Sequence, residues 1–575
     1  MKKLFLGNEA VARGLYEAGV RVVSSYPGTP STEITEYAAT YEDIYAEWAP
    51  NEKVAAEVAC GASLGGARAF CGMKHVGLNV AADPVFTASY VGVNAGLVIG
   101  VADDPGMHSS QNEQDSRHHA IASKIMMLEP SDSAEALEFT KKAYELSEKF
   151  NTPVMLRMCT RVAHSRSLAE LGERSGDELK PYEKNPAAHV MLPAFARPKH
   201  VMVEQRTLDE IAYAENCELN RVEMNSGEIG VITAGISYCY AKEALGDKAS
   251  YLKLGIVNPL PVQLIKDFAA KVKKLYVIEE LDPIIENHCR AMGIEVIGKD
   301  LFPMCGEFSQ TLVKKLVLGE EAVSVALEDE IPARPPAMCS GCPHRGVFYT
   351  LKKLRLTVSG DIGCYTLGAA APLGAMDWCI CMGASVSALH GFNKARGAEG
   401  ESKSVAVIGD STFMHSGINS LVDIAYNRSA SVVIILDNSI TGMTGHQQNP
   451  TTGVTLKGDV TAAVSLEKLC DAIGISRVKV VDPYDLAALE ATIKEELAAD
   501  QPSVIISRRP CVLLKHVKTA PPVKVNADKC RGCKVCMGMG CPSISFRDGK
   551  ALIDNTLCVG CGVCAQLCKF DAIEK

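Results

Sequence analysis

Residues 404–411 read Ser-Val-Ala-Val-Ile-Gly-Asp-Ser, and residues 431–442 read Ser-Val-Val-Ile-Ile-Leu-Asp-Asn-Ser-Ile-Thr-Gly. Each stretch is an apolar run that ends in polar residues, which indicates a buried strand of a parallel sheet. The 27 residues between Asp410 and Asn438 leave room for a helix and a return strand. Both polar ends are therefore expected at the carboxyl edge of one parallel sheet, where α/β proteins bind ligands.

The polar groups at that edge are typical of a magnesium site. A carboxylate from Asp410, an amide oxygen from Asn438 and the Ile440 carbonyl are ligands that Mg²⁺ takes, with diphosphate oxygens completing the octahedron. The alternative is two ordinary turns at strand ends, since Gly-Asp and Asp-Asn are common turn pairs.

The same alternation of apolar runs, turns and helical stretches extends over most of the chain and predicts an α/β fold. The further strand candidates are Val20–Tyr26, His75–Ala82, Gly96–Ala102, Gly230–Gly235, Leu252–Val257 and Leu275–Ile278. We expect three doubly wound units and one small α+β domain. Their predicted bounds are 1–165, a linker over 166–200, then 201–330, 338–515 and 521–575.

The C-terminal domain contains two runs of cysteines. They are Cys530-x2-Cys533-x2-Cys536-x4-Cys541 and Cys558-x2-Cys561-x2-Cys564-x3-Cys568. This is the ligand pattern of a bacterial-type ferredoxin with two [4Fe-4S] clusters, in which the fourth ligand of each cluster comes from the other run. We therefore expect Cys568 to complete the first cluster and Cys541 to complete the second. Disulfides and zinc are the alternatives, but a third cysteine at x2 spacing fits zinc poorly.

Composition and charge exclude several classes of partner. The 575 residues carry a net charge of −9, which does not favour nucleic acid or an anionic membrane as partner. No uninterrupted apolar stretch reaches about 18 residues, so we expect no membrane span. The polar residues that follow Met1 so soon do not make a signal peptide. Free thiols and cluster ligands suit a reduced, cytoplasmic setting.

The strand ends described first resemble the thiamine-diphosphate motif, Gly-Asp-Gly followed by Asn after nearly thirty residues, with Ser411 in place of the third glycine. Enzymes of this kind need a glutamate for the aminopyrimidine ring, followed nine residues later by a glycine. Glu52 and Gly61 match that spacing. The alternatives are a solvated glutamate in a first helical turn, and Glu57 in the same role.

On these residues the chain resembles the 2-oxoacid:ferredoxin oxidoreductases, and within them the alpha subunits of the indolepyruvate ferredoxin oxidoreductase group. Residues 26–31, Tyr-Pro-Gly-Thr-Pro-Ser, resemble the turn in which Thr29 would contact cofactor and substrate. Residues 444–447 resemble the Thr-Gly-x-Gln that follows the Mg²⁺ loop, and residues 339–345 resemble the opening of the diphosphate domain. The resemblance implies a thiamine pyrimidine-binding domain, a transketolase C-terminal-like domain, a thiamine diphosphate-binding domain and a ferredoxin domain.

The resemblance also implies an activity: oxidative decarboxylation of arylpyruvates such as indolepyruvate with coenzyme A, giving aryl-acetyl-CoA and CO₂ and passing electrons to an external ferredoxin. Glu52 would protonate the aminopyrimidine. Thiamine diphosphate and Mg²⁺ would be held by Gly409, Asp410, Asn438 and the Ile440 carbonyl. A domain found in related enzymes is missing, which implies a smaller beta subunit in a heterodimer.

A third [4Fe-4S] cluster is also implied, held by Cys339, Cys342, Cys364 and Cys511, which match a cysteine pair and two distant cysteines in related enzymes. The alternative is buried structural thiols. For the whole chain, the alternatives are an oxidoreductase for another 2-oxoacid, a non-oxidative thiamine-dependent decarboxylase, and an iron–sulfur electron carrier without catalysis. No residue of the sequence is assigned to the substrate carboxylate, and His344 and His446 are assigned no proton transfer.

Overall fold

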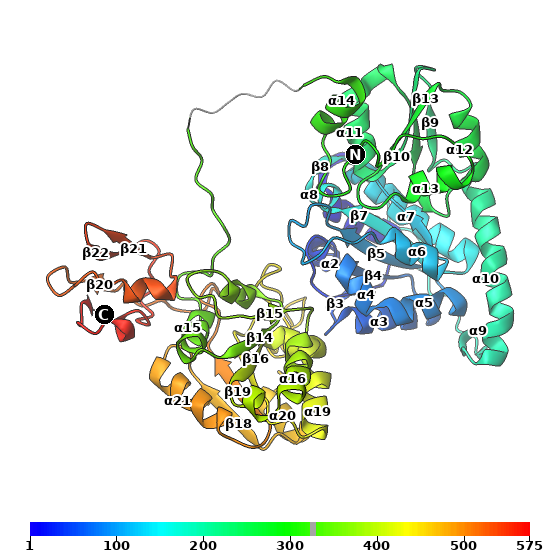
Figure 1. Ribbon diagram of the computed structural model, residues 1–575. Helices are drawn as coiled ribbons and strands as arrows, with labels where there is room; N and C mark the ends of the chain where they lie inside the picture. The colour runs from blue at the N-terminus through cyan, green and yellow to red at the C-terminus, as the bar shows by residue number, and fades with distance from the viewer. Residues whose placement is uncertain (177, 322–328, 575) are drawn as a thin grey trace. The chain divides into compact units, whose positions relative to one another are not determined.

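The computed structural model describes residues 1–176, 178–321 and 329–574 (Figure 1). The chain forms two compact units, which meet in sequence between Glu328 and Asp329. Residue 177 of the predicted linker, residues 322–328 of the predicted middle domain and residue 575 of the predicted ferredoxin domain lie outside the described residues.

The first unit begins with a seven-stranded sheet. In spatial order its strands are β12 (Ile256–Asn258), β6 (Met126–Leu128), β7 (Val154–Cys159), β5 (Leu97–Asp103), β4 (Ala69–Lys74), β2 (Val22–Ser25) and β3 (Tyr45–Trp48). All neighbours are parallel except β12 and β6. The central strands are buried along their whole length, as expected where helices cover both faces. The helices of this part are α1 (Gly7–Glu17), α2 (Thr32–Ala38), α3 (Glu52–Leu64), α4 (His75–Val80), α5 (Ala82–Val91), α6 (Arg117–Ser123), α7 (Ser133–Phe150) and α8 (Thr160–His164).

A second, four-stranded sheet follows in the same unit. Its order is β13 (Lys274–Ile278), β10 (Ile229–Ala234), β11 (Ser250–Leu254) and β9 (Arg221–Glu223), with β9 antiparallel to β11. Its helices are α11 (Gly235–Leu245), α12 (Val262–Ala269), α13 (Ile284–Ala291) and α14 (Gln310–Leu318). The predicted strand over 252–257 is divided at Gly255, and its second half, β12, joins the first sheet. A side chain at Gly255 would collide with the Leu219 carbonyl, so the chain can change sheets there only with glycine.

Two segments of the first unit differ from their predicted structure. The strand expected over 75–82 is wrong, because His75–Val80 forms α4; a short apolar run does not distinguish a strand from a buried helix. The segment expected to be a linker contains β8 (Arg166–Glu170), which pairs with β1 (Lys2–Leu6), then α9 (Pro186–His189) and the start of α10 (Pro193–Ala214). Its polar residues suit an edge strand and an exposed helix as well as a loop.

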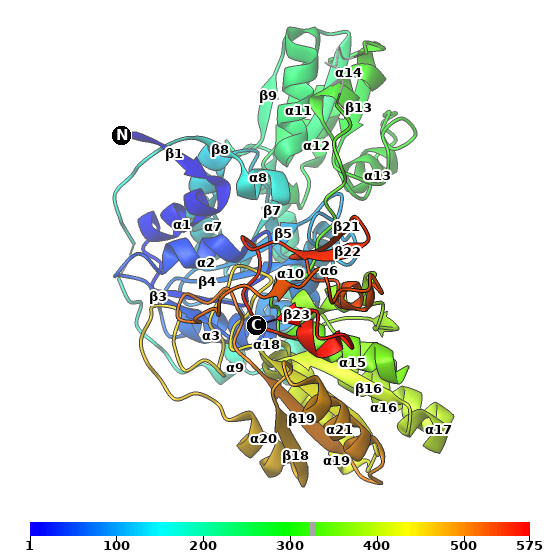
Figure 2. The ribbon, with the colours of Figure 1, turned by 90° about the vertical axis from the view of Figure 1, so that its left-hand side faces the viewer.

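The second unit contains a six-stranded, fully parallel sheet. Its order is β15 (Trp378–Cys379), β14 (Thr357–Gly360), β16 (Ser404–Gly409), β17 (Val432–Asp437), β19 (Ser503–Arg508) and β18 (Arg477–Val481). Figures 1 and 2 show α15 (His344–Leu354) and α21 (Leu486–Leu497) on one face, and α16 (Ala384–Arg396), α19 (Ile418–Tyr426) and α20 (Leu466–Ile473) on the other. Alternate residues of β16 and β17 enter the two cores, Val405 and Val407 one of them and Ala406 and Ile408 the other.

The small C-terminal domain of this unit holds two two-stranded sheets. They are β20 (Lys524–Val525) with β23 (Ile573–Glu574), and β21 (Ile544–Arg547) with β22 (Lys550–Ile553). The 3₁₀ helices η4 (Val535–Met539) and η5 (Ala565–Leu567) follow the cysteine loops. The domain packs on the six-stranded sheet's helices through a small apolar cluster of Met539, Val563 and Leu486. The predicted fold class, α/β units with a ferredoxin-like end, is confirmed.

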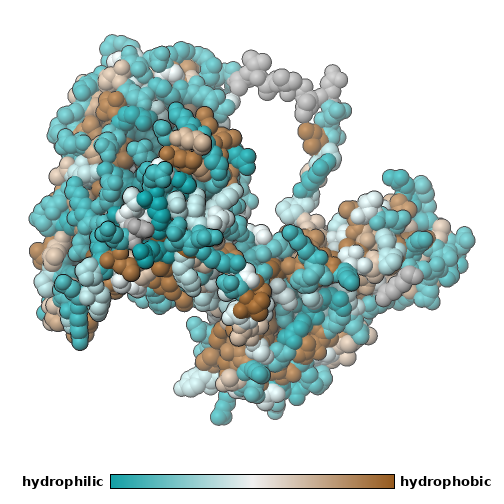
Figure 3. Space-filling view, turned by 180° about the vertical axis from the view of Figure 1, so that it is seen from behind, coloured by the Kyte–Doolittle hydropathy of each residue, from teal (hydrophilic) through white to brown (hydrophobic). Residues whose placement is uncertain are grey.

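Nowhere in the described parts of the chain is a helix both long and apolar enough to cross a membrane. The face drawn in Figure 3 has hydrophobic residues scattered among hydrophilic ones.

Candidate active site and cluster sites

The predicted magnesium ligands lie at the carboxyl ends of two adjacent strands. β16 ends at Gly409, and Asp410 begins the next short helix; β17 ends at Asp437 and is followed by Asn438. The two strands are parallel, with Gly409 opposite Leu436. Their ends therefore meet at one edge of the sheet, as the spacing of the two motifs predicts.

Three oxygen atoms converge at this edge. The Asn438 side-chain amide lies 2.7 Å from the Ile440 carbonyl oxygen and 3.3 Å from Asp410 Oδ1. Its other amide atom faces the buried ring nitrogen Nε2 of His344 at 3.5 Å. When the amide nitrogen points to His344, the amide oxygen faces two further oxygens with no donor between them. A cation such as Mg²⁺ fits that arrangement of hard oxygen ligands.

Burial and the neighbouring Asp437 carboxylate raise the pKa of Asp410 to about 7. The Thr451 hydroxyl donates to its Oδ2 at 3.4 Å. Ser411, which replaces the motif glycine, accepts a hydrogen bond from the Thr441 hydroxyl at 2.9 Å. These threonines carry no motif signal of their own; only the folded loop brings them beside Asp410.

The first unit buries Glu52 and exposes its rival Glu57. Glu52 begins α3 directly after the N-cap Asn51, and 5 % of its surface is accessible. Helix α4 passes so close that a β-carbon on Gly77 would lie 2.6 Å from Glu52 Oε1. Glu57 instead forms an ion pair with Lys53, and its side chain is 46 % exposed. The site of Gly61 is open to solvent on the side where a side chain would project.

The Thr29 turn lies between β2 and α2 and contains a cis peptide bond from Thr29 to Pro30. The Ser31 hydroxyl donates to the Gly28 carbonyl at 2.8 Å, and the Ser109 hydroxyl donates to the Thr29 carbonyl at 3.3 Å. The turn and Glu52 belong to the first unit and the magnesium ligands to the second.

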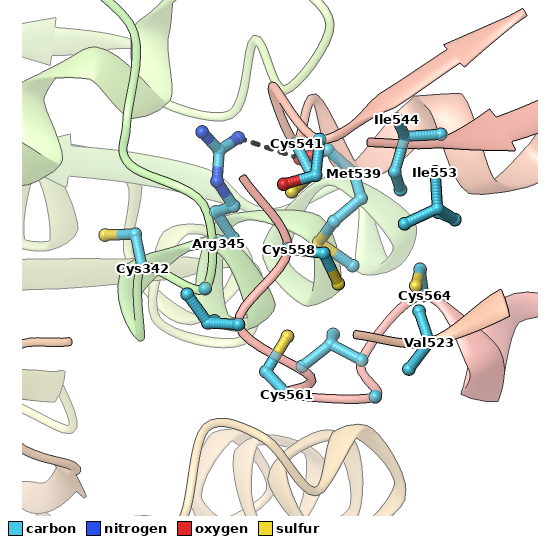
Figure 4. A pocket seen from close by; sticks show the side chains of 15 residues that line it. Cys342, Arg345, Val523, Met539, Cys541, Ile544, Ile553, Cys558, Cys561 and Cys564 are labelled. Carbon is cyan, nitrogen blue, oxygen red and sulfur yellow. Dashed lines mark hydrogen bonds between the residues drawn. The ribbon is translucent and has the colours of Figure 1, made fainter. Parts of the chain in front are cut away.

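Two pockets in the C-terminal domain are each lined by one predicted set of four cysteines. Cys530, Cys533, Cys536 and Cys568 line one pocket. Cys541, Cys558, Cys561 and Cys564 line the other, together with Cys342 of the third predicted set (Figure 4). Both pockets thus draw cysteines from both runs. Among described residues no three metal-binding side chains lie close enough to bind a single metal ion. A [4Fe-4S] cluster is larger than one ion, so its four cysteine ligands lie farther apart.

The four cysteines of the third predicted set also come together, from three separate segments. Burial raises the pKa of the Cys364 thiol, and the nearby Cys511 and Cys339 raise it further. Burial likewise raises the pKa of Cys342 to about 12, with contributions from Cys339 and Cys364. The backbone N–H of Cys511 donates to the Asn438 carbonyl at 2.9 Å. The thiol group therefore adjoins the three-oxygen site.

Both histidines of the motif loops lie at these sites. Burial lowers the pKa of His344 to about 4, so its ring is neutral at physiological pH. His446 Nε2 lies 4.0 Å from the Cys511 sulfur.

Three family profiles match the chain. They are "Pyruvate flavodoxin/ferredoxin oxidoreductase, thiamine diP-bdg" over residues 13–228, "Thiamine pyrophosphate enzyme, C-terminal TPP binding domain" over 361–507 and "4Fe-4S binding domain" over 551–574. They agree with thiamine diphosphate and [4Fe-4S] as cofactors of the chain.

Curated relatives extend the likeness to the full length. Indolepyruvate oxidoreductase subunit IorA from Archaeoglobus fulgidus is 42% identical, covering 100% of this chain and 97% of that protein. The subunit of the same name from Pyrococcus horikoshii is 40% identical over 100% and 97%. The 2-oxoglutarate synthase subunit KorA from Methanothermobacter marburgensis is 27% identical over 48% of this chain and 86% of its own length. The chain is therefore an oxidoreductase subunit that belongs to the IorA family of indolepyruvate oxidoreductases, within the 2-oxoacid:ferredoxin oxidoreductases.

Proposed function

We propose that the chain catalyses the oxidative decarboxylation of an arylpyruvate such as indolepyruvate. The arylpyruvate loses CO₂, its acyl group passes to the sulfur of coenzyme A, and two electrons leave singly for two molecules of oxidised ferredoxin; the thiol proton is released. The observation that carries this proposal is the hydrogen bond from Cys511 to the Asn438 carbonyl, which joins a cation site to a group of four thiols. The names of the full-length relatives support indolepyruvate as substrate.

Thiamine diphosphate, when bound, supplies the electron sink that makes loss of CO₂ from a 2-oxoacid possible. Asp410, Asn438 and the Ile440 carbonyl would hold Mg²⁺ and through it the diphosphate, because their oxygens already converge. Gly409 allows the backbone close to this edge: a β-carbon there would lie 2.8 Å from the Tyr365 ring. Glu52, buried beside α4, would hold a proton against the aminopyrimidine ring, and Thr29 would contact cofactor and substrate.

The cysteine sets would conduct the electrons. The two C-terminal pockets would each take a [4Fe-4S] cluster, since each is lined by one complete predicted set of four cysteines. We further propose a third cluster on Cys339, Cys342, Cys364 and Cys511, supported by the mutual proximity of these thiols. A beta subunit would complete the catalytic assembly, in keeping with the name "subunit" in the relatives.

The test is an anaerobic assay of the chain together with its beta subunit. Indolepyruvate, phenylpyruvate, pyruvate and 2-oxoglutarate are compared, with reduction of ferredoxin and formation of acyl-CoA both recorded. We expect CoA-dependent ferredoxin reduction that is fastest with the arylpyruvates. Release of an aldehyde without CoA would show a non-oxidative decarboxylase, and a preference for 2-oxoglutarate would instead follow the weaker likeness to KorA. Electron transfer without turnover of any 2-oxoacid would indicate that the chain is an iron–sulfur electron carrier without catalysis.

A further inference from the structure

Arg345 is a buried guanidinium near the start of α15, and 4 % of its surface is accessible. Its Nε donates to the Cys339 carbonyl at 3.0 Å, and another nitrogen donates to the Met338 carbonyl. On the opposite side it donates to the carbonyls of Met539, at 3.1 Å, and Gly540. The side chain thus joins the Cys339–Cys342 loop to the loop that leads into Cys541.

All of these acceptors are neutral carbonyls. Within residues 1–176, 178–321 and 329–574 no carboxylate forms an ion pair with Arg345, although an arginine this deeply buried normally has one. The ionisable groups that act most strongly on it are four thiols: Cys541, Cys342, Cys339 and Cys561. Figure 4 shows the guanidinium between Cys342 and Cys541, with the hydrogen bond to Met539 drawn.

These four thiols belong to two different predicted cluster sets. As thiols they are neutral and leave the guanidinium uncompensated. As thiolates around iron–sulfur clusters they carry the negative charge that a buried cation needs. The Cys339–Cys342 loop also touches the ferredoxin domain elsewhere: the Ser543 hydroxyl donates to Ser340 Oγ at 2.7 Å, and a β-carbon on Gly341 would collide with Val559 of the second cysteine run.

We infer that Arg345 is the shared counter-charge of the second and third clusters, positioning the ferredoxin domain on the thiamine domain and setting the potentials at which the two clusters take electrons. The inference rests on the proposed cluster sites. A positive charge beside a cluster stabilises the reduced form, which is the more negative one, and so raises its reduction potential. Arg345 would therefore raise the reduction potentials of both clusters and make each easier to reduce.

The experiment is an EPR-monitored redox titration of the complete complex, with iron analysis, for wild type, Arg345→Met, Arg345→Lys and Arg396→Met. Arg396, whose side chain is 52 % exposed and pairs with Glu399, is the control for loss of a surface charge. We expect Arg345→Met to shift the second cluster to a more negative potential and to slow ferredoxin reduction. Arg345→Lys should restore most of the potential, while Arg396→Met should match wild type.

Two results would overturn the inference: an unchanged potential of the second cluster in Arg345→Met, or equal shifts in the Met and Lys variants. If Arg345→Met loses iron, the Arg345→Lys variant decides, because a lysine retains the positive charge and should restore both clusters. Loss of iron from both variants would overturn the counter-charge role. Iron and thiamine content of the wild type tests the proposed function separately. A missing third cluster would overturn the shared role, because only the second cluster would then remain for Arg345 to compensate.

Discussion

Asp410 combines burial, a carboxylate neighbour and convergent oxygens, and the proposed cofactor site depends on it more than on any other single residue. Replacing Asp410 by alanine removes a hard oxygen ligand and leaves the diphosphate charge uncompensated. Loss of an outer partner alone costs metal sites about 10–100-fold in affinity, so we expect at least ~100-fold weaker binding of Mg²⁺–thiamine diphosphate. Calorimetric titration measures this, and iron content should stay at the wild-type level. Unchanged cofactor affinity would remove Asp410 from the site.

The raised pKa of Asp410 gives a pH dependence. The carboxyl binds Mg²⁺ only when ionised, and its pKa in the folded, metal-free protein is about 7. Affinity is therefore complete above pH 7 and falls as the pH drops through that value, whereas an ordinary aspartate would titrate near pH 4. Titration at pH 8 and pH 6 should differ by about tenfold. Asp410→Asn, which cannot ionise, controls for protonation of the diphosphate; a slope equal to wild type would contradict the assignment.

Glu52 and Glu57 provide a matched pair on one helix, the first buried and the second exposed. Glu52→Gln keeps the volume and removes the ionisable group. Turnover should fall by about 10²–10⁴-fold, as for loss of an acid–base group, while the cofactor still binds. Glu57→Gln should retain nearly full activity. Steady-state kinetics of the two variants decides the matter, and the reverse ranking would transfer the role to Glu57.

At the scale of elements, the proposed clusters would each take one ligand from the other cysteine loop. The pocket around Cys530, Cys533 and Cys536 is closed by Cys568, and the pocket around Cys558, Cys561 and Cys564 is closed by Cys541. Cys568→Ser should therefore weaken or remove the first cluster, and Cys541→Ser the second, each with loss of up to about four irons. EPR of the two variants identifies which signal disappears. If each run bound its own cluster, the two outcomes would be exchanged.

At the scale of the whole molecule, the proposed chain of clusters predicts an iron count. Two clusters require about eight irons per chain and three require about twelve. We expect twelve, with about four lost in a Cys339→Ser, Cys342→Ser double variant whose thiamine content is unchanged. Iron analysis under anaerobic conditions measures both. An unchanged count in the double variant would leave these residues as structural thiols, and full CoA-dependent activity of this chain alone would remove the need for a beta subunit.

Local patterns determined a large part of this protein. Apolar runs ending in Gly-Asp and Asp-Asn predicted β16 and β17 and the meeting of their polar ends, because parallel strands share one carboxyl edge. The cysteine spacings predicted the two sets of thiols that line the two pockets, because each tight loop presents three cysteines and leaves the fourth to the other run. Both patterns can be read in short stretches of chain, because strand formation and the geometry of a tight cysteine loop depend mainly on neighbouring residues.

Only the tertiary structure decided the rest. The run at His75–Val80 forms a helix that packs against Glu52 through Gly77, although its short apolar pattern fits a strand equally well. Gly255 marks a change of sheet because the Leu219 backbone lies against it. His344 beside Asn438, Thr451 beside Asp410 and Arg345 between two cysteine loops join residues far apart in sequence. No periodicity or spacing encodes such contacts, since burial and electrostatic compensation exist only once the chain has packed.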